Sequence, residues 1–326
     1  MPLQQINAQW INYEDTGGAL TPVAFAHGLL MDHGMFDRQV EALAGAYRVI
    51  TWDARCHGET ETASDPFTFW DLADDLSGLL DHLGIKRAAV GGMGQGGSVA
   101  LRFALRYPEK VSALLLMGTQ AGTEAPEKAA LYGGIVEEWD RDGLTGKLAE
   151  TIGSIILGSE SPDRVPWIAK WRRMPRSAVR QAFQALVSRE DLDDRLNEIK
   201  AHALVIRGTG DAAITVDEAQ RLSSRLGGGG PLVAIDGAGH ACNLTHPAPV
   251  NQAMQQFLGE VGLGTRRAAN RRGTLRRRQL ERRFGERREP VRASAGRRIQ
   301  SQSDRRREER RAADRRVQSI VRVVNR

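Results

Sequence analysis

The pattern of apolar and polar positions predicts alternating strands and helices along most of the chain. Short apolar or alternating stretches, typical of β-strands, occupy residues 6–13, 23–26, 48–52, 88–91, 113–117, 203–207 and 232–235. Between them, residues 67–83 repeat apolar side chains at helical spacing, and residues 95–107 form a second helical pattern that stops before Pro108. This alternation predicts an α/β fold, a mostly parallel sheet flanked by helices.

Residues 122–200 interrupt the alternation with helix-like segments alone, broken at Pro162, Pro166 and Pro175. We expect this segment to form a helical cap, because insertions of this kind exclude water and select substrates. The cap holds Trp139, Trp167 and Trp171, which we expect to line a substrate pocket. Ordinary core packing is the alternative for each of them. The core would then be residues 1–121 and 201–263.

The net charge of +6 conceals two opposed parts. Residues 264–326 hold 23 arginines, no lysine and 7 acidic residues, which leaves 23 basic and 33 acidic residues before them. The folded part is therefore acidic, and the basic character belongs to an Arg-rich tail. With few apolar residues the tail cannot bury a core, so we expect it to be disordered.

Two other interpretations of the tail stay open. Arginine without lysine is also typical of an out-of-frame extension of a GC-rich gene. Basic runs attract nucleic acids, but the tail shows no ladder of stacking aromatic residues and no known nucleic-acid module. Nucleic-acid binding through the tail is therefore the weakest functional hypothesis.

Several classes of protein are disfavoured by composition. No apolar run approaches the roughly 18 residues that span a bilayer, and the first residues do not resemble a signal peptide. Cys56 and Cys242 are the only cysteines, which does not indicate a disulfide framework. We expect a cytoplasmic protein with no membrane association. Because histidines lack metal-ligand spacing and no dinucleotide fingerprint is present, we expect no metal and no cofactor. Oligomeric state stays open.

One turn decides which chemistry the chain can perform. Residues 90–97 read Val-Gly-Gly-Met-Gly-Gln-Gly-Gly, a strand that turns directly into a helix. In a nucleophile elbow, G-x-S-x-G, such a turn lifts the attacking side chain above the sheet. Gly92 and Gly96 hold the flanking positions, and Gly94 stands where the nucleophile would be. No covalent acyl-enzyme can form at a glycine.

Four further motifs accompany the elbow, and the five follow one another in the order Ala26-His27-Gly28-Leu29, Asp53-Ala54-Arg55-Cys56-His57-Gly58, the elbow, Gly208-Thr209-Gly210-Asp211, and Gly237-Ala238-Gly239-His240. With these motifs in the family's order, the chain from about Ile6 to Leu263 resembles the α/β-hydrolase superfamily, in particular small esterases and enol-lactone or carbon–carbon hydrolases with a helical cap. The chain departs from the family at Gly94, where serine is expected, and at Cys56, where glycine is usual.

The resemblance implies the roles of individual residues. His240 matches the catalytic base, and Asp211 matches the acid that orients it. The backbone N–H groups of Leu29 and Gln95 match the oxyanion hole. Other residues of the motifs, His27, Asp53, Arg55 and His57, are expected to brace loops. Neither Ser98, one turn along the helix, nor Cys56 is expected to replace the missing hydroxyl.

Three interpretations of Gly94 follow. The domain is a hydrolase of small carboxylic esters, lactones or related carbonyl compounds that keeps activity by directing water with His240 and Asp211. Alternatively, it is a ligand-binding or regulatory relative that has kept the pocket without the reaction. The third interpretation is that Gly94 replaces a serine of the source sequence.

Overall fold

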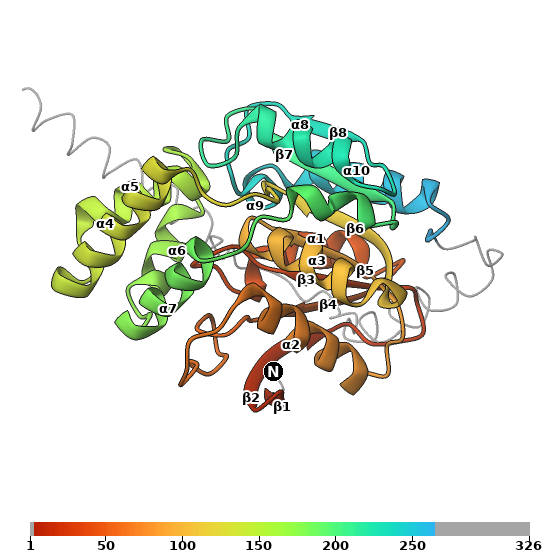
Figure 1. Cartoon of the computed structure of the whole chain (residues 1–326), viewed down its shortest axis with the longest axis horizontal. Helices are drawn as coiled ribbons and strands as arrows, with labels where there is room; N and C mark the ends of the chain where they lie inside the picture. The colour runs from red at the N-terminus through yellow and green to blue at the C-terminus, as the bar shows by residue number, and fades with distance from the viewer. Residues whose placement is uncertain (1–2, 265–326) are drawn as a thin grey trace, which may run out of the picture. The chain divides into compact units, whose positions relative to one another are not determined.

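The structure, a computed structural model, describes residues 3–264 (Figure 1). The Arg-rich segment beyond Gly264 lies outside the described residues, and so do the predictions of a disordered tail and of nucleic-acid binding. Eight strands form one sheet in the order β1-β2-β4-β3-β5-β6-β7-β8. They are β1 (Leu3–Ile6), β2 (Gln9–Asp15), β3 (Pro22–Ala26), β4 (Arg48–Trp52), β5 (Ala88–Met93), β6 (Val111–Met117), β7 (Ala203–Gly208) and β8 (Leu232–Ile235).

The first predicted strand is wrong in one respect, because the stretch 6–13 spans a turn. β1 and β2 form an antiparallel hairpin, with Ile6 opposite Gln9. The turn residues Asn7 and Ala8 have φ angles of 46° and 64°. Two consecutive residues with positive φ angles form the tight turn that matches the twist of a hairpin. Glycine is the usual residue at the second position, so alanine there does not signal the turn. From β4 to β8 every pairing is parallel, as the alternation predicted.

Helices cover both faces of the sheet because alternate strand residues point to opposite sides. On one face, Val90 and Leu114 belong to a core that includes the apolar side of α2 (Phe69–His82) and α3 (Gln95–Arg106). On the other face, Ala89 and Leu115 pack in a core with α1 (Asp37–Leu43) and α10 (Pro247–Glu260). The remaining helices of the second half are α8 (Val216–Arg225) and α9 (Cys242–Thr245). An α/β fold with a mostly parallel sheet is confirmed.

Four helices gather at one end of the sheet, in the segment expected to form the cap (Figure 1). They are α4 (Pro126–Asp142), α5 (Gly146–Leu157), α6 (Arg164–Trp171) and α7 (Arg176–Val187). The expected helix break at Pro166 is not found. This proline lies in the first turn of α6, where the missing N–H has no helical acceptor to lose. Short 3₁₀ segments at His33–Phe36, Pro108–Lys110 and Asp193–Glu198 complete the described elements.

Within residues 3–264, no helix combines the length and the apolar character that crossing a bilayer requires.

Candidate active site

The turn at Gly94 joins β5 to α3 in a conformation that suits glycine. Gly94 has φ 53° and ψ −114°, outside the regions that side chains with a Cβ normally occupy. The flanking glycines are required for a different reason. A Cβ on Gly92 would overlap the Gly96 backbone, and a Cβ on Gly96 would overlap the carbonyl group of Ala26. Gly92 therefore lets β5 turn closely into α3, and Gly96 lets the start of α3 lie against the end of β3.

A side chain at position 94 would face the imidazole of His240. An ideal Cβ built on Gly94 lies 3.2 Å from His240 Nε2 and 3.7 Å from Cε1. The next nearest heavy atom is the Gly118 carbonyl oxygen, at 3.8 Å. The space above Gly94 is thus bounded by the ring nitrogen that a base would use. This is the arrangement that a nucleophile at the elbow requires.

His240 is held by a carboxylate that is itself fixed by backbone donors. Nδ1 of His240 lies 3.1 Å from both oxygens of Asp211, and Asp211 Oδ1 accepts hydrogen bonds from the N–H groups of Ala213 and Ile214. Burial alone would raise the pKa of Asp211, but the charge and hydrogen bond of His240 and the two backbone donors lower it overall. Asp211 is therefore ionised at neutral pH and orients the ring with Nε2 toward Gly94.

The loops that carry the pair are tied to each other. Asp211 follows β7 and His240 follows β8, two adjacent parallel strands whose carboxyl ends lie at one edge of the sheet. The N–H of Gly210 donates to the Ala238 carbonyl, and the N–H of Thr209 donates to the Ile235 carbonyl. The sequence motifs at Gly208 and Gly237 thus meet in space, which brings Asp211 and His240 together.

Two backbone N–H groups without an acceptor in the described part of the chain belong to residues that line the same cavity. Among residues 3–264, the N–H groups of Leu29 and Gln95 have no hydrogen-bond acceptor in the protein, and both residues line the cavity that contains Gly94 and His240. Gln95 is the first residue of α3, where the helix leaves its N–H unpaired. Leu29 follows β3. Free donors of this kind are suited to stabilise an oxyanion.

The loop after β3 is braced by two buried histidines. His27 donates from Nδ1 to the Gly28 carbonyl and accepts at Nε2 from the Ala54 N–H, and His57 accepts at Nε2 from the Leu30 N–H. Leu30 needs this support because its φ is 62°, a conformation unfavourable for a residue with a Cβ. Burial lowers the pKa of His57 to about 3. Burial also lowers the pKa of His27, and each ring accepts a backbone N–H at Nε2, so both rings are neutral and hold the loop in place.

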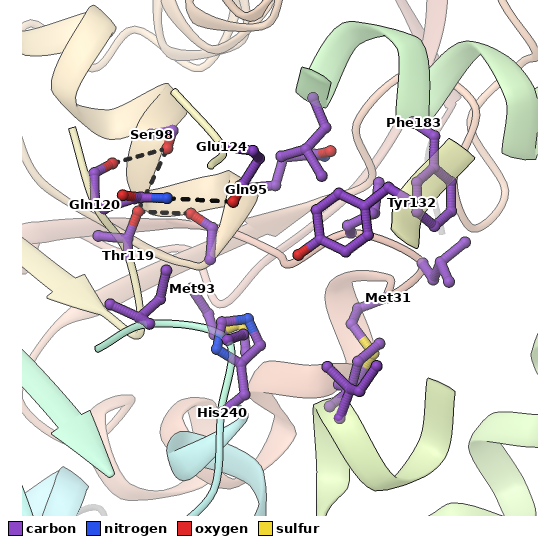
Figure 2. A pocket seen from close by; sticks show the side chains of 18 of the residues that line it. Met31, Met93, Gln95, Ser98, Thr119, Gln120, Glu124, Tyr132, Phe183 and His240 are labelled. Carbon is purple, nitrogen blue, oxygen red and sulfur yellow. Dashed lines mark hydrogen bonds between the residues drawn. The ribbon is translucent and has the colours of Figure 1, made fainter. Parts of the chain in front are cut away.

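The cavity beside Gly94 has a volume of about 80 Å³. A buried water occupies about 10–15 Å³ on this measure, so the cavity accepts a small organic group. Figure 2 shows Ser98, Thr119 and Gln120 on one side, and Tyr132 and Phe183 on the other, with His240 at the bottom. The cap contributes an apolar wall that sequence reasoning missed, formed by Ile135, Ile152, Ile155, Ile156, Phe183 and Leu186. The i, i+3, i+4 spacing on α5 was the available signal.

The three tryptophans do not line this cavity, contrary to expectation. Trp139, Trp167 and Trp171 are buried in the hydrophobic core that joins the cap to the sheet. Trp171 has a specific task, because its indole N–H donates to the Leu30 carbonyl at 2.7 Å. A buried indole N–H needs an acceptor, and here the acceptor belongs to the loop after β3. Trp171 also borders a second, more polar hollow beside Asp32 and Cys56.

Replacing Trp171 with phenylalanine is expected to weaken both the fold and the site. The Leu30 carbonyl would lose its buried donor, which costs about 1–3 kcal/mol in the free energy of unfolding. Denaturant titration measures that loss, and ester hydrolysis or ligand affinity reports the loosened loop. Trp139→Phe is the matched control, since no hydrogen bond of Trp139 would be removed among the described residues. Equal effects of the two substitutions would contradict the assignment.

Neither Ser98 nor Cys56 occupies the space where a side chain of residue 94 would lie. The Ser98 hydroxyl borders the cavity but donates to the Gln120 carbonyl, at 3.2 Å. Burial raises the pKa of the Cys56 thiol, which contacts Gln181 and borders the second hollow. A buried thiol with a raised pKa is a poor nucleophile.

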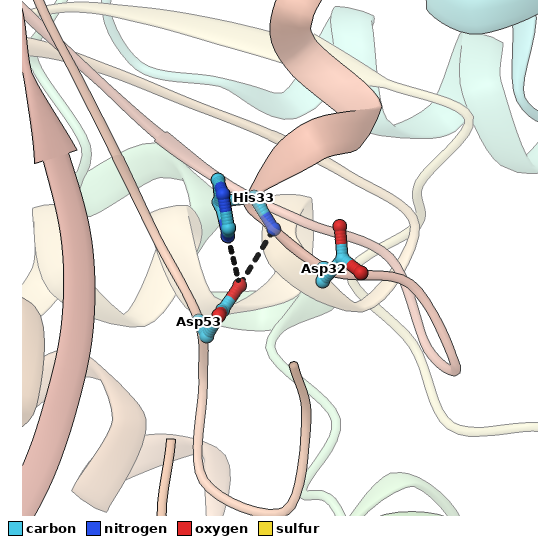
Figure 3. Close-up of side chains that lie close together, drawn as sticks. All are labelled: Asp32, His33 and Asp53. Carbon is cyan, nitrogen blue, oxygen red and sulfur yellow. Dashed lines mark hydrogen bonds and ion pairs between the residues drawn. The ribbon is translucent and has the colours of Figure 1, made fainter. Parts of the chain in front are cut away.

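Asp32, His33 and Asp53 lie close enough to suggest a metal site (Figure 3). The two carboxylates already have hydrogen-bond or ion-pair partners. Asp53 Oδ1 accepts from the His33 N–H and Nδ1, and Oδ2 accepts from Asn12 Nδ2 and the Glu59 N–H. Asp32 forms an ion pair with Lys170 of the cap. The arrangement fits a brace for the loop after β4 and does not fit a metal ligand set.

Asp53→Asn is expected to destabilise the fold by about 3–5 kcal/mol, because either amide orientation turns NH₂ toward two donors.

Burial would raise the pKa of Asp53, but its bonds to His33 lower it overall, whereas hydrogen bonding to Asp53 raises the pKa of His33. The contribution of the pair to stability is therefore lost as pH falls through the lowered pKa or rises through the raised one. Unfolding free energies should show it at full strength between roughly pH 4 and 6.5. A flat profile would contradict it.

Comparisons with known proteins agree with the geometry. The family model described as alpha/beta hydrolase fold matches residues 21–247. A 2-hydroxy-6-oxononadienedioate/2-hydroxy-6-oxononatrienedioate hydrolase of Paraburkholderia phymatum is 31% identical over 265 residues, covering 77% of this chain and 91% of the relative. A 3-oxoadipate enol-lactonase of Acinetobacter baylyi is 25% identical, covering 76% and 92%.

Solved structures give the same result. A thermophilic esterase from Thermogutta terrifontis has a TM-score of 0.72 at 30% identity, covering 78% of this chain and 94% of that one. The enol-lactonase from Burkholderia xenovorans has a TM-score of 0.73 at 25% identity, covering 79% and 100%. With the family model matching most of the chain, and with the turn at Gly94 and the loops of Asp211 and His240 at one edge of the sheet, this protein belongs to the α/β-hydrolase family.

Proposed function

We propose that this protein hydrolyses small carboxylic esters or lactones slowly, through a water molecule that takes the place of the absent nucleophile. The observation that carries the proposal is the position of His240 Nε2, 3.2 Å from where a Cβ of residue 94 would stand. Water above Gly94 would lie within reach of that nitrogen. The relatives are named as hydrolases, lactonases and esterases, which supports this class of reaction.

The reaction would proceed without a covalent intermediate. His240 Nε2 accepts a proton from the water as its oxygen bonds to the substrate carbonyl carbon, and Asp211 stabilises the imidazolium that results. The carbonyl oxygen becomes an oxyanion that accepts from the N–H groups of Leu29 and Gln95. When the carbon–oxygen bond to the alcohol breaks, the His240 proton goes to the leaving alkoxide. The products are the carboxylic acid and the alcohol.

The decisive alternative is a binding protein that has kept the pocket and lost the reaction. Gly94 favours it directly, because the family chemistry needs a nucleophile at this position. Product formation from short-chain aryl esters and lactones, at high protein concentration and with a His240→Ala control, separates the two functions. Turnover that disappears with His240 supports hydrolysis. Saturable binding without turnover would establish the binding function.

A further inference from the structure

A buried ion pair forms part of the polar wall of the cavity. Glu124 Oε1 lies 2.9 Å from Arg189 Nη2, and only 6% and 2% of the two side chains are exposed. Both residues line the cavity (Figure 2 shows Glu124). Arg189 also donates from Nε and Nη2 to the Gly122 carbonyl and from Nη1 to the Leu186 carbonyl. Its guanidinium is therefore committed to the protein.

Glu124 also binds a second cation. Its Oε2 lies 3.2 Å from Nζ of Lys128, which donates to the Ala213 carbonyl and lies 3.7 Å from Glu218. This group therefore contains two cations and two carboxylates. Of the side chains that line the cavity, only Glu124 and Arg189 are acidic or basic residues, and the imidazole of His240 is paired with Asp211. Among the described residues, the cavity wall thus offers no cation without an anionic partner.

We propose that the cavity selects esters and lactones whose acyl part is uncharged, and that Glu124 determines this selectivity by neutralising Arg189. A carboxylate on the substrate would have to leave water and compete with Glu124 for a cation that is already paired. The apolar cap residues beside the pair provide no compensation. An alkyl or lactone ring meets no such cost. The inference rests on the proposed function, since it names the substrate class of the same site.

Two esters of equal chain length test the selectivity. Ethyl butyrate ends its acyl chain in a methyl group, and monoethyl succinate ends it in a carboxylate. The quantity measured is the ratio of kcat/KM for the two, by ethanol release, in this chain and in a Gly94→Ser variant that amplifies the rate. We expect the unmodified wall to favour butyrate by about tenfold or more, since a buried site rejects a group that it leaves unpaired.

Matched variants move the ratio in opposite directions. Glu124→Gln keeps the shape and frees Arg189, so the ratio should shift toward succinate by about tenfold, as for a close charge pair. Arg189→Gln leaves Glu124 as an excess anion and should shift the ratio further toward butyrate. The double variant restores neutrality and should return near the starting ratio. If Glu124→Gln alone fails to fold, the difference between Arg189→Gln and the double variant still measures the effect of Glu124 on the ratio.

Binding separates failure of this inference from failure of the proposed function. Butyramide and succinamate differ in the same terminal group, and their affinities can be compared by calorimetry without turnover. If neither the unmodified protein nor its Gly94→Ser variant hydrolyses any ester, the proposed function fails. The ratio of the affinities for butyramide and succinamate still tests the selectivity. Equal handling of charged and uncharged ligands overturns the inference. So does a folded Glu124→Gln protein with an unchanged ratio.

Discussion

Serine in place of Gly94 is expected to raise ester hydrolysis by roughly a hundredfold or more. The hydroxyl would extend from a Cβ position that already lies 3.2 Å from His240 Nε2, so the base could activate it directly. In a well-studied protease, loss of the nucleophile lowers turnover about a millionfold, and the variant still exceeds the reaction in water by about 10³–10⁴-fold through binding and the oxyanion hole. Stopped-flow measurement on an aryl ester should show a burst of phenol, which reports a covalent acyl-enzyme.

Gly94→Ala is the matched control for this gain. It adds the same Cβ in the same strained backbone conformation, with φ 53°, but no hydroxyl. Both variants should lose about 1–3 kcal/mol of unfolding free energy, because glycine tolerates this conformation and other residues do not. Alanine should give neither burst nor gain, and it should displace the water that the glycine accommodates. A faster ester hydrolysis with alanine, or no increase with a folded serine variant, would argue against residue 94 as the nucleophile position.

Loss of His240 is the second large effect. His240→Ala should reduce any hydrolysis by this chain by about 10²–10⁴-fold, the usual contribution of general-base catalysis. The Asp211 carboxylate would remain, buried and without its imidazole partner, so stability should be checked alongside activity. Progress curves at high protein concentration measure the residual rate against spontaneous hydrolysis.

His246→Ala provides the comparison. His246 is another partly buried histidine a short distance along the chain, and its Nδ1 contacts the neighbouring Thr245 hydroxyl and no carboxylate among the described residues. Its loss should leave hydrolysis near the starting rate. Equal turnover of the two variants would remove His240 from the mechanism and favour a binding protein.

The sequence predicted the features that depend on local pattern. Parallel strands, the elbow glycines and the loops bearing Asp211 and His240 all lie in short segments whose chemistry is visible without a partner. The hairpin of β1 and β2 was missed because Asn7 and Ala8 take up left-handed angles without the glycine that usually indicates them. That turn became visible only through the pairing of Ile6 with Gln9.

Features that depend on tertiary contact were not predictable from pattern. Tryptophans in the cap were natural candidates for the pocket, yet Trp171 finds its acceptor at Leu30, 141 residues earlier. The cavity is instead lined by cap isoleucines and by Tyr132 and Phe183, whose burial depends on how four helices pack. The pairing of Glu124 with Arg189 likewise joins the two ends of the cap segment, and nothing in the local sequence of either residue indicates it.

The bond between Trp171 and the Leu30 carbonyl has a consequence for the order of events at the site. Any swing of α6 that breaks it removes one of the bonds that hold Leu30, next to Leu29 and its free N–H, and leaves the bond from the Leu30 N–H to His57. A ligand that entered the cavity during such a swing would meet the Leu29 N–H before its loop is fully held. The loop would be fully held only when α6 returns and Trp171 binds the Leu30 carbonyl again, so ligand entry would precede completion of the site.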